Sequence, residues 1–304
     1  MCSWRDSTKK QYQCYIKKWI SYCDRKQISS VSASVKDVVE YLTELFEKDF
    51  SYNALNTARS ALSSINLKID NYPAGSHPTV VRFLKGVYNL RPPMSRYQNI
   101  WDVNDVLCYL KKLSPVKLLT LKDLTLKLAM LIALTHAARA QTLQFLSIVG
   151  IQKLSSKFVV YFDGLLKQSR PSFTLTFIEL EAYPPDRRLC VYTVLKEYLS
   201  RTKPVRKNSQ SKRLFLSYVK PYSSVSRDTI SRWIRTVMAR AGVDTSMYKS
   251  HSVRAAASSK AKISSVPIGE IMSAAGWSNA GTFSKFYQKA IQSKDSFSRA
   301  VLQC

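Results

Sequence analysis

Apolar positions in the first ninety residues recur three and four apart, a spacing typical of amphipathic helices. Residues 6–26 carry one such stripe opposite a row of lysines, and Ser7 or Thr8 can cap its start. The stripe consists of Tyr12, Tyr15, Ile16, Trp19 and Ile20. The pattern recurs over residues 34–49, 52–69 and 77–93, where Pro92 and Pro93 stop the last helix. We therefore predict a small helical domain over residues 1–92.

The pattern mixes after a proline-containing linker at residues 93–101. Residues 157–178 alternate as a two- or three-stranded antiparallel hairpin does, with turns at Asp163-Gly164 and near residues 169–172. Helical patterns occupy residues 102–113, 120–148, 190–202, 226–242, 250–262 and 267–276. The predicted fold class is mainly α (α+β), with a second domain over residues 102–304 that contains a small antiparallel sheet.

Charge is the strongest compositional feature of the chain. Forty-seven Lys and Arg against 20 Asp and Glu leave a formal net charge of +27. Such a charge favours a large polyanionic partner, and double-stranded DNA is the partner that we expect. An anionic membrane is the alternative, which we disfavour because no single helix concentrates its basic and apolar faces strongly enough.

Several other classes of protein are disfavoured by the sequence. It contains no run of 18 apolar residues, and its first residues lack the apolar region of a signal peptide, so we expect a soluble intracellular protein. The six cysteines are too scattered for a zinc site or a disulfide framework. They are Cys2, Cys14, Cys23, Cys108, Cys190 and Cys304.

The candidate chemistry begins with one of only three histidines, His251, which lies three residues before Arg254. Trp277 and Tyr287 follow on helix-like sequence. An imidazole, a guanidinium, an indole N–H and a phenol suit phosphate chemistry, and none of them requires a metal. Each also has an ordinary interpretation: the His–Arg pair as a solvated helix face, Trp277 as a core residue and Tyr287 as one of 17 tyrosines.

Two further basic residues precede this group. Arg139 follows an apolar helix and is either a site residue or a cation at the helix C-terminus. Lys167 lies in the predicted hairpin and is either a site residue or a solvated charge. We interpret His136 as a helix-end residue near the site and His77 as a surface residue before a proline.

Taken in order, these residues resemble the tyrosine recombinase, or phage-type integrase, superfamily. Its signature is an early Arg, a Lys on a β-turn, His-x-x-Arg, a His or Trp, and a nucleophilic Tyr near the C-terminus. The matching positions are Arg139, Lys167, His251, Arg254, Trp277 and Tyr287. The stretches KQSRP, AGWS and TFSKFY more closely resemble recombinases of DIRS-like and Ngaro-like retroelements.

The chain departs from the family pattern at two places. Thr142 stands where an acidic residue often follows the first Arg, so the support of Arg139 must come from elsewhere. The interval from Trp277 to Tyr287 is one residue longer than in many bacterial members. Tyr222 and Tyr248 are alternative nucleophiles, but they fit the order of the motifs less well.

The resemblance implies strand cleavage through a 3′-phosphotyrosyl bond, without metal, ATP or another cofactor. Arg139 and Arg254 would hold the scissile phosphate and Trp277 would donate its N–H to it. His251 would transfer the proton of the Tyr287 hydroxyl, and Lys167 would protonate the departing 5′-oxygen.

The resemblance also implies a DNA clamp and an assembly. Residues 1–92 would form a core-binding (SAM-like) domain, in which residues 53–64 face either the major groove or solvent. The amphipathic tail after Tyr287 would dock on a neighbouring protomer in a homo-tetramer on two DNA sites. Its apolar residues are Ile291, Phe297, Val301 and Leu302.

The leading functional interpretation is integration of a mobile element. A type IB topoisomerase-like enzyme would share the chemistry without pairing two duplexes, and a domesticated DNA-binding protein would keep the fold without activity. The protein of a eukaryotic element would act in the nucleus, and otherwise we expect it in the cytoplasm or nucleoid.

Overall fold

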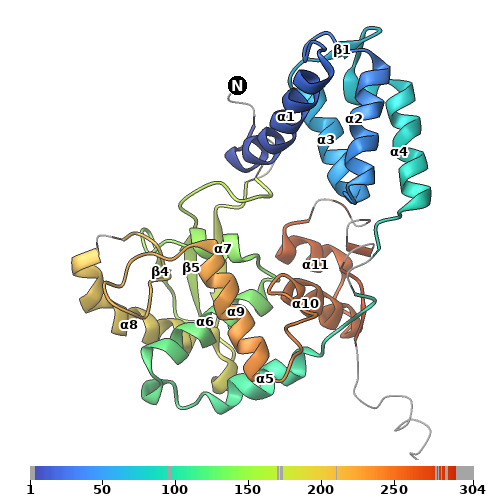
Figure 1. Ribbon diagram of the computed structural model, residues 1–304. Helices are drawn as coiled ribbons and strands as arrows, with labels where there is room; N and C mark the ends of the chain where they lie inside the picture. The colour runs from blue at the N-terminus through green and yellow to red at the C-terminus, as the bar shows by residue number, and fades with distance from the viewer. Residues whose placement is uncertain are drawn as a thin grey trace, which may run out of the picture. The chain divides into compact units, whose positions relative to one another are not determined.

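The computed structural model describes residues 4–94, 97–169, 171, 174–209, 211–277, 279, 281, 283–284 and 287–291, with the backbone alone at 207–209. The chain divides into an N-terminal unit, Met1–Arg96, and a C-terminal unit, Tyr97–Cys304 (Figure 1). The predicted linker, residues 93–101, spans this division.

The N-terminal unit is a helical bundle with a short hairpin. It comprises α1 (Asp6–Lys26), α2 (Val35–Glu47), α3 (Tyr52–Ser64), β1 (Lys68–Ile69), β2 (Tyr72–Pro73), a 3₁₀ turn (Ala74–Ser76) and α4 (Pro78–Leu90). Its core contains Trp19, which is fully buried, whereas the predicted stripe member Ile20 is 44% exposed. Tyr22 and Cys23 fill that side of α1 instead.

Most of these helices have a side-chain cap at their N-terminus. Ser34 and Asp37 form a reciprocal capping box at the start of α2, and Ser51 caps α3. The predicted caps of the first helix were wrong, because α1 begins at Asp6 and Arg5 precedes it without a side-chain cap. His77 accepts a hydrogen bond from the Thr79 amide and caps α4, so this buried histidine is not the predicted surface residue.

The C-terminal unit contains seven helices and two small sheets among its described residues. Its helices are α5 (Val103–Lys112), α6 (Leu121–Thr135), α7 (Ala140–Phe145), α8 (Val191–Ser209), α9 (Arg227–Arg240), α10 (Ser252–Ile263) and α11 (Ile268–Ala275). Its strands are β3 (Asn99–Ile100), β4 (Gln152–Lys153), β5 (Lys157–Tyr161), β6 (Phe177–Glu181) and β7 (Ala290–Ile291), and 3₁₀ turns occupy Val116–Leu118 and Arg187–Leu189. The predicted mainly α fold with a small antiparallel sheet is confirmed.

Helix α6 forms the centre of the C-terminal unit. Every residue from Leu124 to Leu134 is buried, and the helix contacts α8, α9 and α10 (Figure 1). The continuous helix predicted over residues 120–148 is wrong, because α6 ends at Thr135 and a turn separates it from α7. Ala137 in that turn has φ 40°, which a helix cannot accommodate.

The three-stranded sheet has the order β4-β5-β6 and is antiparallel. Strand β5 pairs with β6 from Lys157–Glu181 to Tyr161–Phe177, and β4 pairs with its other edge. The predicted antiparallel pairing within residues 157–178, with turns at Asp163-Gly164 and near residues 169–172, is wrong in its connections. Strand β5 pairs with β6 across a long loop, and the third strand, β4, precedes both in sequence. Residues 162–176 form a loop, of which 170, 172 and 173 lie outside the described residues.

Candidate active site

The turn after α6 places Arg139 at the start of α7. Arg139 is the residue before the first turn of that helix, four positions beyond the end of α6, so it does not close α6 as a C-terminal cation. Its Nη1 donates to Gln168 Oε1 at 3.0 Å. The support that the sequence required for Arg139 thus comes from a neutral amide rather than from an acidic residue at position 142.

Arg254 lies on the first turn of α10 and is 3% exposed. Alanines follow it on the helix, and their small size allows the close packing of α10 against α6. The guanidinium donates from Nη1 to the Ala137 carbonyl at 2.6 Å and from Nη2 to the Ala275 carbonyl at 2.5 Å. Arg254 therefore holds together the turn before Arg139 and the end of α11.

The two arginines create a positive centre. Burial first, and the positive charge of Arg139 second, lower the pKa of Arg254 to about 10, while Tyr287 opposes the shift. Arg254 stays charged at neutral pH. Among the described residues, no carboxylate forms an ion pair with either arginine. An anion bound here would relieve the repulsion between them.

Trp277 follows α11 because Gly276 ends that helix with φ 63°, a conformation that favours glycine. The indole ring lies 4.4 Å from the Arg254 guanidinium carbon and 5.5 Å from the fully buried Phe283 ring. Two buried side-chain donors lack a hydrogen-bond partner within the described part of the chain: Trp277 Nε1 and Arg254 Nε. Such groups are costly unless a ligand satisfies them.

Tyr287 packs against both of these side chains. Its ring centroid lies 4.5 Å from that of Trp277, and the guanidinium carbon of Arg254 lies 5.5 Å from the Tyr287 centroid. The backbone is fixed as well, because the Ser259 hydroxyl donates to the Tyr287 carbonyl and accepts from the Lys289 amide. The longer interval after Trp277 therefore does not prevent Tyr287 from reaching Arg254.

Lys167 is exposed in a turn of the β5–β6 loop and makes no hydrogen bond or ion pair with the described residues. Its neighbour Gln168 connects this loop to the site. Gln168 binds Arg139, and its Nε2 lies 3.0 Å from where a side chain on Gly276 would begin. The structure thus brings the lysine loop to Arg139, while the Lys167 side chain is exposed to solvent.

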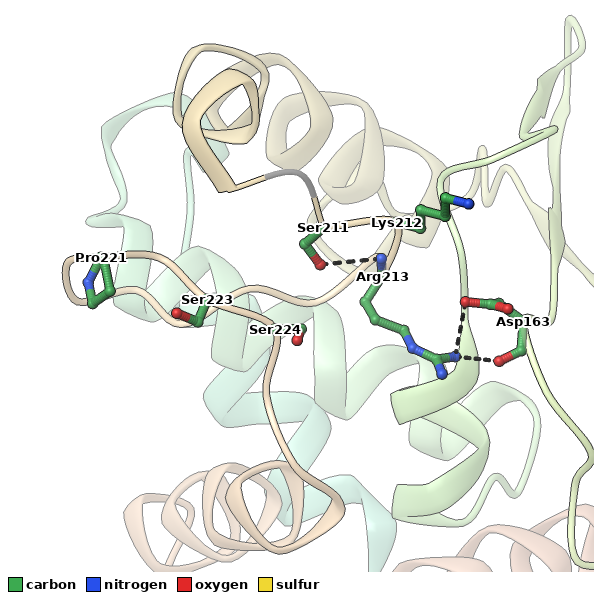
Figure 2. Close-up of a pocket in the computed structure, with 7 residues that line it drawn as sticks. All are labelled: Asp163, Ser211, Lys212, Arg213, Pro221, Ser223 and Ser224. Carbon is green, nitrogen blue, oxygen red and sulfur yellow. Dashed lines mark hydrogen bonds and ion pairs between the residues drawn. The ribbon is translucent and has the colours of Figure 1, made fainter.

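The start of the β5–β6 loop, at Asp163 and Gly164, is held by contacts with Arg213 and Phe145. Arg213 donates to the Asp163 carbonyl at 2.6 Å and stacks on the ring of Phe145 in α7. Figure 2 shows the Arg213 side chain reaching to Asp163. Gly164 has φ 139° and lies against the same Phe145 ring, so only glycine fits this turn without strain.

His251 precedes α10 and is exposed, three residues before Arg254. Its Nε2 lies 2.8 Å from the Tyr97 hydroxyl, a contact that no sequence pattern predicts. The alternative nucleophile Tyr248 is 4% exposed and donates its hydroxyl to the Asn99 carbonyl. It packs in the core, as a structural residue does.

His136 follows the last residue of α6 and faces the sheet. Its Nε2 lies 2.9 Å from the Glu179 carbonyl, and burial lowers its pKa. Within the described part of the chain, its hydrogen bonds connect it to Thr135 and Glu179, and none reaches Arg139 or Arg254. His136 therefore contributes to the packing of α6 on β6.

The arrangement of Arg139, Arg254, Trp277 and Tyr287 agrees with a family match. The model of the phage integrase family matches residues 111–293, more than half of the chain. The chain belongs to the phage integrase family. No curated protein matches the sequence of this phage integrase family member.

Solved structures show the same fold. XerH site-specific recombinase bound to difH substrate is 13% identical with a TM-score of 0.63, covering 97% of this chain and 79% of that one. The Tn1549 transposon integrase in complex with transposon right end DNA is 15% identical with a TM-score of 0.61, covering 100% and 96%. A lambda integrase dimer bound to a COC′ core site is 14% identical with a TM-score of 0.55, covering 94% and 73%.

The described residues were also compared with the predictions on membrane spans, metal ligands and cysteines. None of its described helices is long and apolar enough to cross a membrane. No group of three or more His, Cys, Asp or Glu among them could hold a metal ion. Cys14, Cys23, Cys108 and Cys190 are free thiols. The remaining two cysteines and the tail residues Phe297, Val301 and Leu302 lie outside the described residues.

Proposed function

We propose that this phage integrase family member is a site-specific DNA recombinase that cleaves and rejoins strands through a 3′-phosphotyrosyl intermediate. One observation supports the proposal most. Among the described residues, Arg139 and Arg254 have no carboxylate partner, and the buried N–H groups of Arg254 Nε and Trp277 Nε1 have no acceptor. The Tyr287 ring packs against Arg254 and Trp277. A scissile phosphate offers the charge and the acceptor oxygens that these groups lack.

The proposed step is an in-line displacement at phosphorus. The Tyr287 oxygen forms a bond to the phosphorus and the bond to the 5′-oxygen breaks, which leaves a 3′-phosphotyrosyl ester and a 5′-hydroxyl. Arg139 and Arg254 neutralise the charge that develops on the non-bridging oxygens, and Trp277 Nε1 donates to one of them. The ester keeps the energy of the broken bond, so the reverse attack by a 5′-hydroxyl needs no ATP.

Two protons move in this step. His251 accepts the proton of the Tyr287 hydroxyl, and Lys167 donates one to the departing 5′-oxygen. A solvent-exposed ammonium on a loop anchored at both Gln168 and Asp163 suits an acid that meets its substrate only when DNA binds. Gln168 would position this loop relative to Arg139.

The biological setting that we propose is the integration of a mobile element of the DIRS-like or Ngaro-like kind, in the nucleus of a eukaryotic host. The motifs around Lys167 and Trp277 support this subgroup. A homo-tetramer on two DNA sites would pair the duplexes, with residues after Tyr287 docking on a neighbouring protomer. The matches to the Tn1549 and lambda integrases support this proposal only through a similar fold.

Covalent capture from a pool of randomised, nicked duplexes tests the function without knowledge of the target. The wild-type protein should retain DNA after denaturation with detergent, and the sequence of that DNA would reveal the site. Tyr287→Phe should retain none, while Tyr183→Phe, at a half-exposed tyrosine on the β6 side of the unit, should match the wild type. Adduct with relaxation but no strand exchange would indicate the topoisomerase alternative, and binding without adduct the domesticated protein.

A further inference from the structure

The hydroxyl of Ser259 binds the chain on both sides of Gln288. Its Oγ donates to the Tyr287 carbonyl at 2.8 Å and accepts from the Lys289 amide at 3.0 Å. The side chain is buried, with 2% of Ser259 exposed. A hydroxyl carries a single donor hydrogen, so the bond to Tyr287 uses the whole donor capacity of this group. Ser259 is thereby tied to the residue that we propose as the nucleophile and to the second residue after it.

These bonds lie where the chain changes from a helical turn to a strand. The Tyr287 amide donates to the Phe283 carbonyl at 2.8 Å, four positions back as in a helix, and the Gln288 amide donates to the same oxygen at 2.9 Å. Strand β7 then begins at Ala290. Carbonyls at the end of a helical turn have no donor within the helix, and Ser259 supplies one to Tyr287. The hydroxyl therefore fixes the Tyr287 backbone between these two elements.

Ser259 and Arg254 belong to the same helix. Ser259 follows Arg254 by five residues on α10, which separates them by ~7.5 Å along the helix axis. The Arg254 guanidinium carbon lies 5.5 Å from the Tyr287 ring centroid, while the Ser259 hydroxyl holds the Tyr287 carbonyl. One helix thus contacts both the side chain and the backbone of Tyr287. A shift of the Tyr287 backbone away from Arg254 has to stretch the bonds to Ser259.

The preceding residue, Ser258, shows what distinguishes Ser259. Ser258 is equally buried, with 2% exposed, and its hydroxyl lies 2.7 Å from the Arg254 carbonyl and 3.3 Å from the Ala255 carbonyl, both on its own helix. This is the ordinary bonding of a serine inside a helix. Ser259 uses its donor outside the helix instead, on a residue 28 positions away. Its bond therefore holds the Tyr287 segment and not α10 itself.

The proposed displacement makes strict demands on the position of the phenol oxygen. This atom has to approach the phosphorus in line with the departing 5′-oxygen, and misplacement of a reacting group by about 1 Å can slow a reaction by ~10²-fold. The phenol oxygen is the side-chain atom farthest from the backbone, so a small rotation of the Tyr287 backbone moves it more than any other atom of the residue. Stacking on Trp277 orients the ring, and the backbone bonds determine the point from which the ring projects.

We propose that Ser259 is a positioning residue for the nucleophile: its two hydrogen bonds hold the Tyr287 backbone on α10, so that the phenol oxygen lies in line with a phosphate bound at Arg254. This role rests on the proposed function of the site. Ser259 acts through Tyr287 and does not itself touch the phosphate. Removal of its hydroxyl should therefore slow the chemical step and leave the binding of DNA intact.

Amide hydrogen exchange in the free protein, followed residue by residue by NMR, tests the placement without any DNA. In the wild type the Lys289 amide should exchange slowly, because the Ser259 hydroxyl accepts its hydrogen. Ser259→Ala should speed exchange at Lys289 by ~5-fold or more, the range expected for one lost hydrogen bond. Ser258→Ala is the matched control, since it removes an equally buried hydroxyl from the same helix, and it should leave exchange at Lys289 unchanged.

The rate of adduct formation on nicked duplex DNA, measured in a single turnover, tests the role in the reaction. Ser259→Ala should slow adduct formation by ~10-fold or more, while the dissociation constant for DNA stays the same. Ser259→Thr keeps the hydroxyl, so it should restore both the protection of the Lys289 amide and the rate. Ser258→Ala should react as the wild type does. A merely structural role would weaken DNA binding together with the rate.

Several results would overturn the proposal. Unchanged exchange at Lys289 in Ser259→Ala would remove the link, and a wild-type rate in that variant would remove the positioning role. Equal losses of rate in Ser259→Ala and Ser258→Ala would show that a buried hydroxyl, and not the bonds to the Tyr287 segment, is the cause. A slow Ser259→Thr variant with a protected Lys289 amide would also contradict the role.

Failure of the proposed function gives a different result. A wild type with a Lys289 amide protected by Ser259 that forms no adduct on any DNA would contradict strand cleavage, and with it the role of Ser259 in cleavage. The link between Ser259 and the Tyr287 segment would then stand as a feature of the fold.

Discussion

The Arg254 guanidinium lies 4.4 Å from the centre of the Trp277 indole, and each side chain has a buried N–H that no described group accepts. A cation over an aromatic face is a favourable contact in itself. Both orphaned donors belong to side chains that pack on Tyr287. This relationship, more than any single motif, places the phosphate in our proposal.

Arg254 and Arg139 should respond differently to truncation. Arg254→Ala leaves the buried carbonyls of Ala137 and Ala275 without donors, so we expect the free energy of unfolding to fall by ~1–3 kcal/mol. Arg139→Ala loses one hydrogen bond to the described residues, the bond to Gln168, and should destabilise the protein less. Both variants should slow adduct formation by ~10²-fold or more through lost charge stabilisation. Urea denaturation and a cleavage assay measure the two effects separately.

Arg254→Lys is the control for charge alone. A lysine keeps one positive charge but cannot donate to two carbonyls and lie flat on the indole. It should therefore remain nearly as impaired in cleavage as Arg254→Ala. Recovery of wild-type rates by Arg254→Lys would contradict the role of the planar guanidinium.

Gln168 should affect the rate of cleavage through its contacts with Arg139 and Gly276. Gln168→Ala removes the link between the lysine loop, Arg139 and Gly276, and we expect cleavage to slow by ~10-fold while DNA affinity is kept. Gln168→Glu would place a carboxylate on Arg139, where it competes with the phosphate. It should slow cleavage more than Gln168→Ala does. A Gln168→Glu rate above that of the wild type would show that Arg139 needs an acidic partner.

Lys167→Ala should leave DNA affinity nearly unchanged, since one phosphate contact among many is lost. Cleavage should slow by ~10²- to 10⁴-fold for a missing general acid. A substrate with sulfur in place of the bridging 5′-oxygen needs no proton on its leaving group, so it should restore the rate. If sulfur gives no rescue, another group is the acid.

DNA binding should depend strongly on salt because the net charge is +27. With roughly six to ten phosphate contacts, affinity should fall by ~10³-fold or more between 50 and 200 mM salt. Fluorescence anisotropy on a labelled duplex measures this slope. An affinity that stays constant over that range would contradict the nucleic-acid partner.

The sequence predicted those parts of the fold that local signals determine. Helix α9 lies within the helical pattern of residues 226–242 and is capped by Ser226, and the apolar first half of residues 120–148 forms α6. The break at residues 136–139 was missed because alanines there favour a helix. What opposes the helix is a distant group, since Arg254 binds the carbonyl of Ala137 across 117 positions.

The sequence indicated four side chains that lie together in the candidate site, but not the residues that contact and position them. Order and residue type were enough to select Arg139, Arg254, Trp277 and Tyr287, which the structure brings together. Gln168 and Tyr97 follow no periodicity and have partners 29 and 154 positions away. Only the nearness of Gln168 to Lys167 could have suggested it, and nothing in the linker sequence distinguishes Tyr97.

Tyr287→Phe isolates the proposed nucleophile, because it removes one oxygen and leaves the ring that packs on Trp277. Fold and duplex binding should persist, while covalent adduct should vanish. If this variant also lost DNA binding, the loss of adduct would be due to misfolding and not to the missing nucleophile.

Peptide mapping of the adduct trapped by the wild type on a nicked duplex identifies the attacking residue directly. Proteolysis followed by mass spectrometry should find the nucleotide remnant on the peptide that contains Tyr287, and on no other peptide. Attachment to Tyr97, Tyr248 or any other tyrosine would contradict the proposed role of Tyr287.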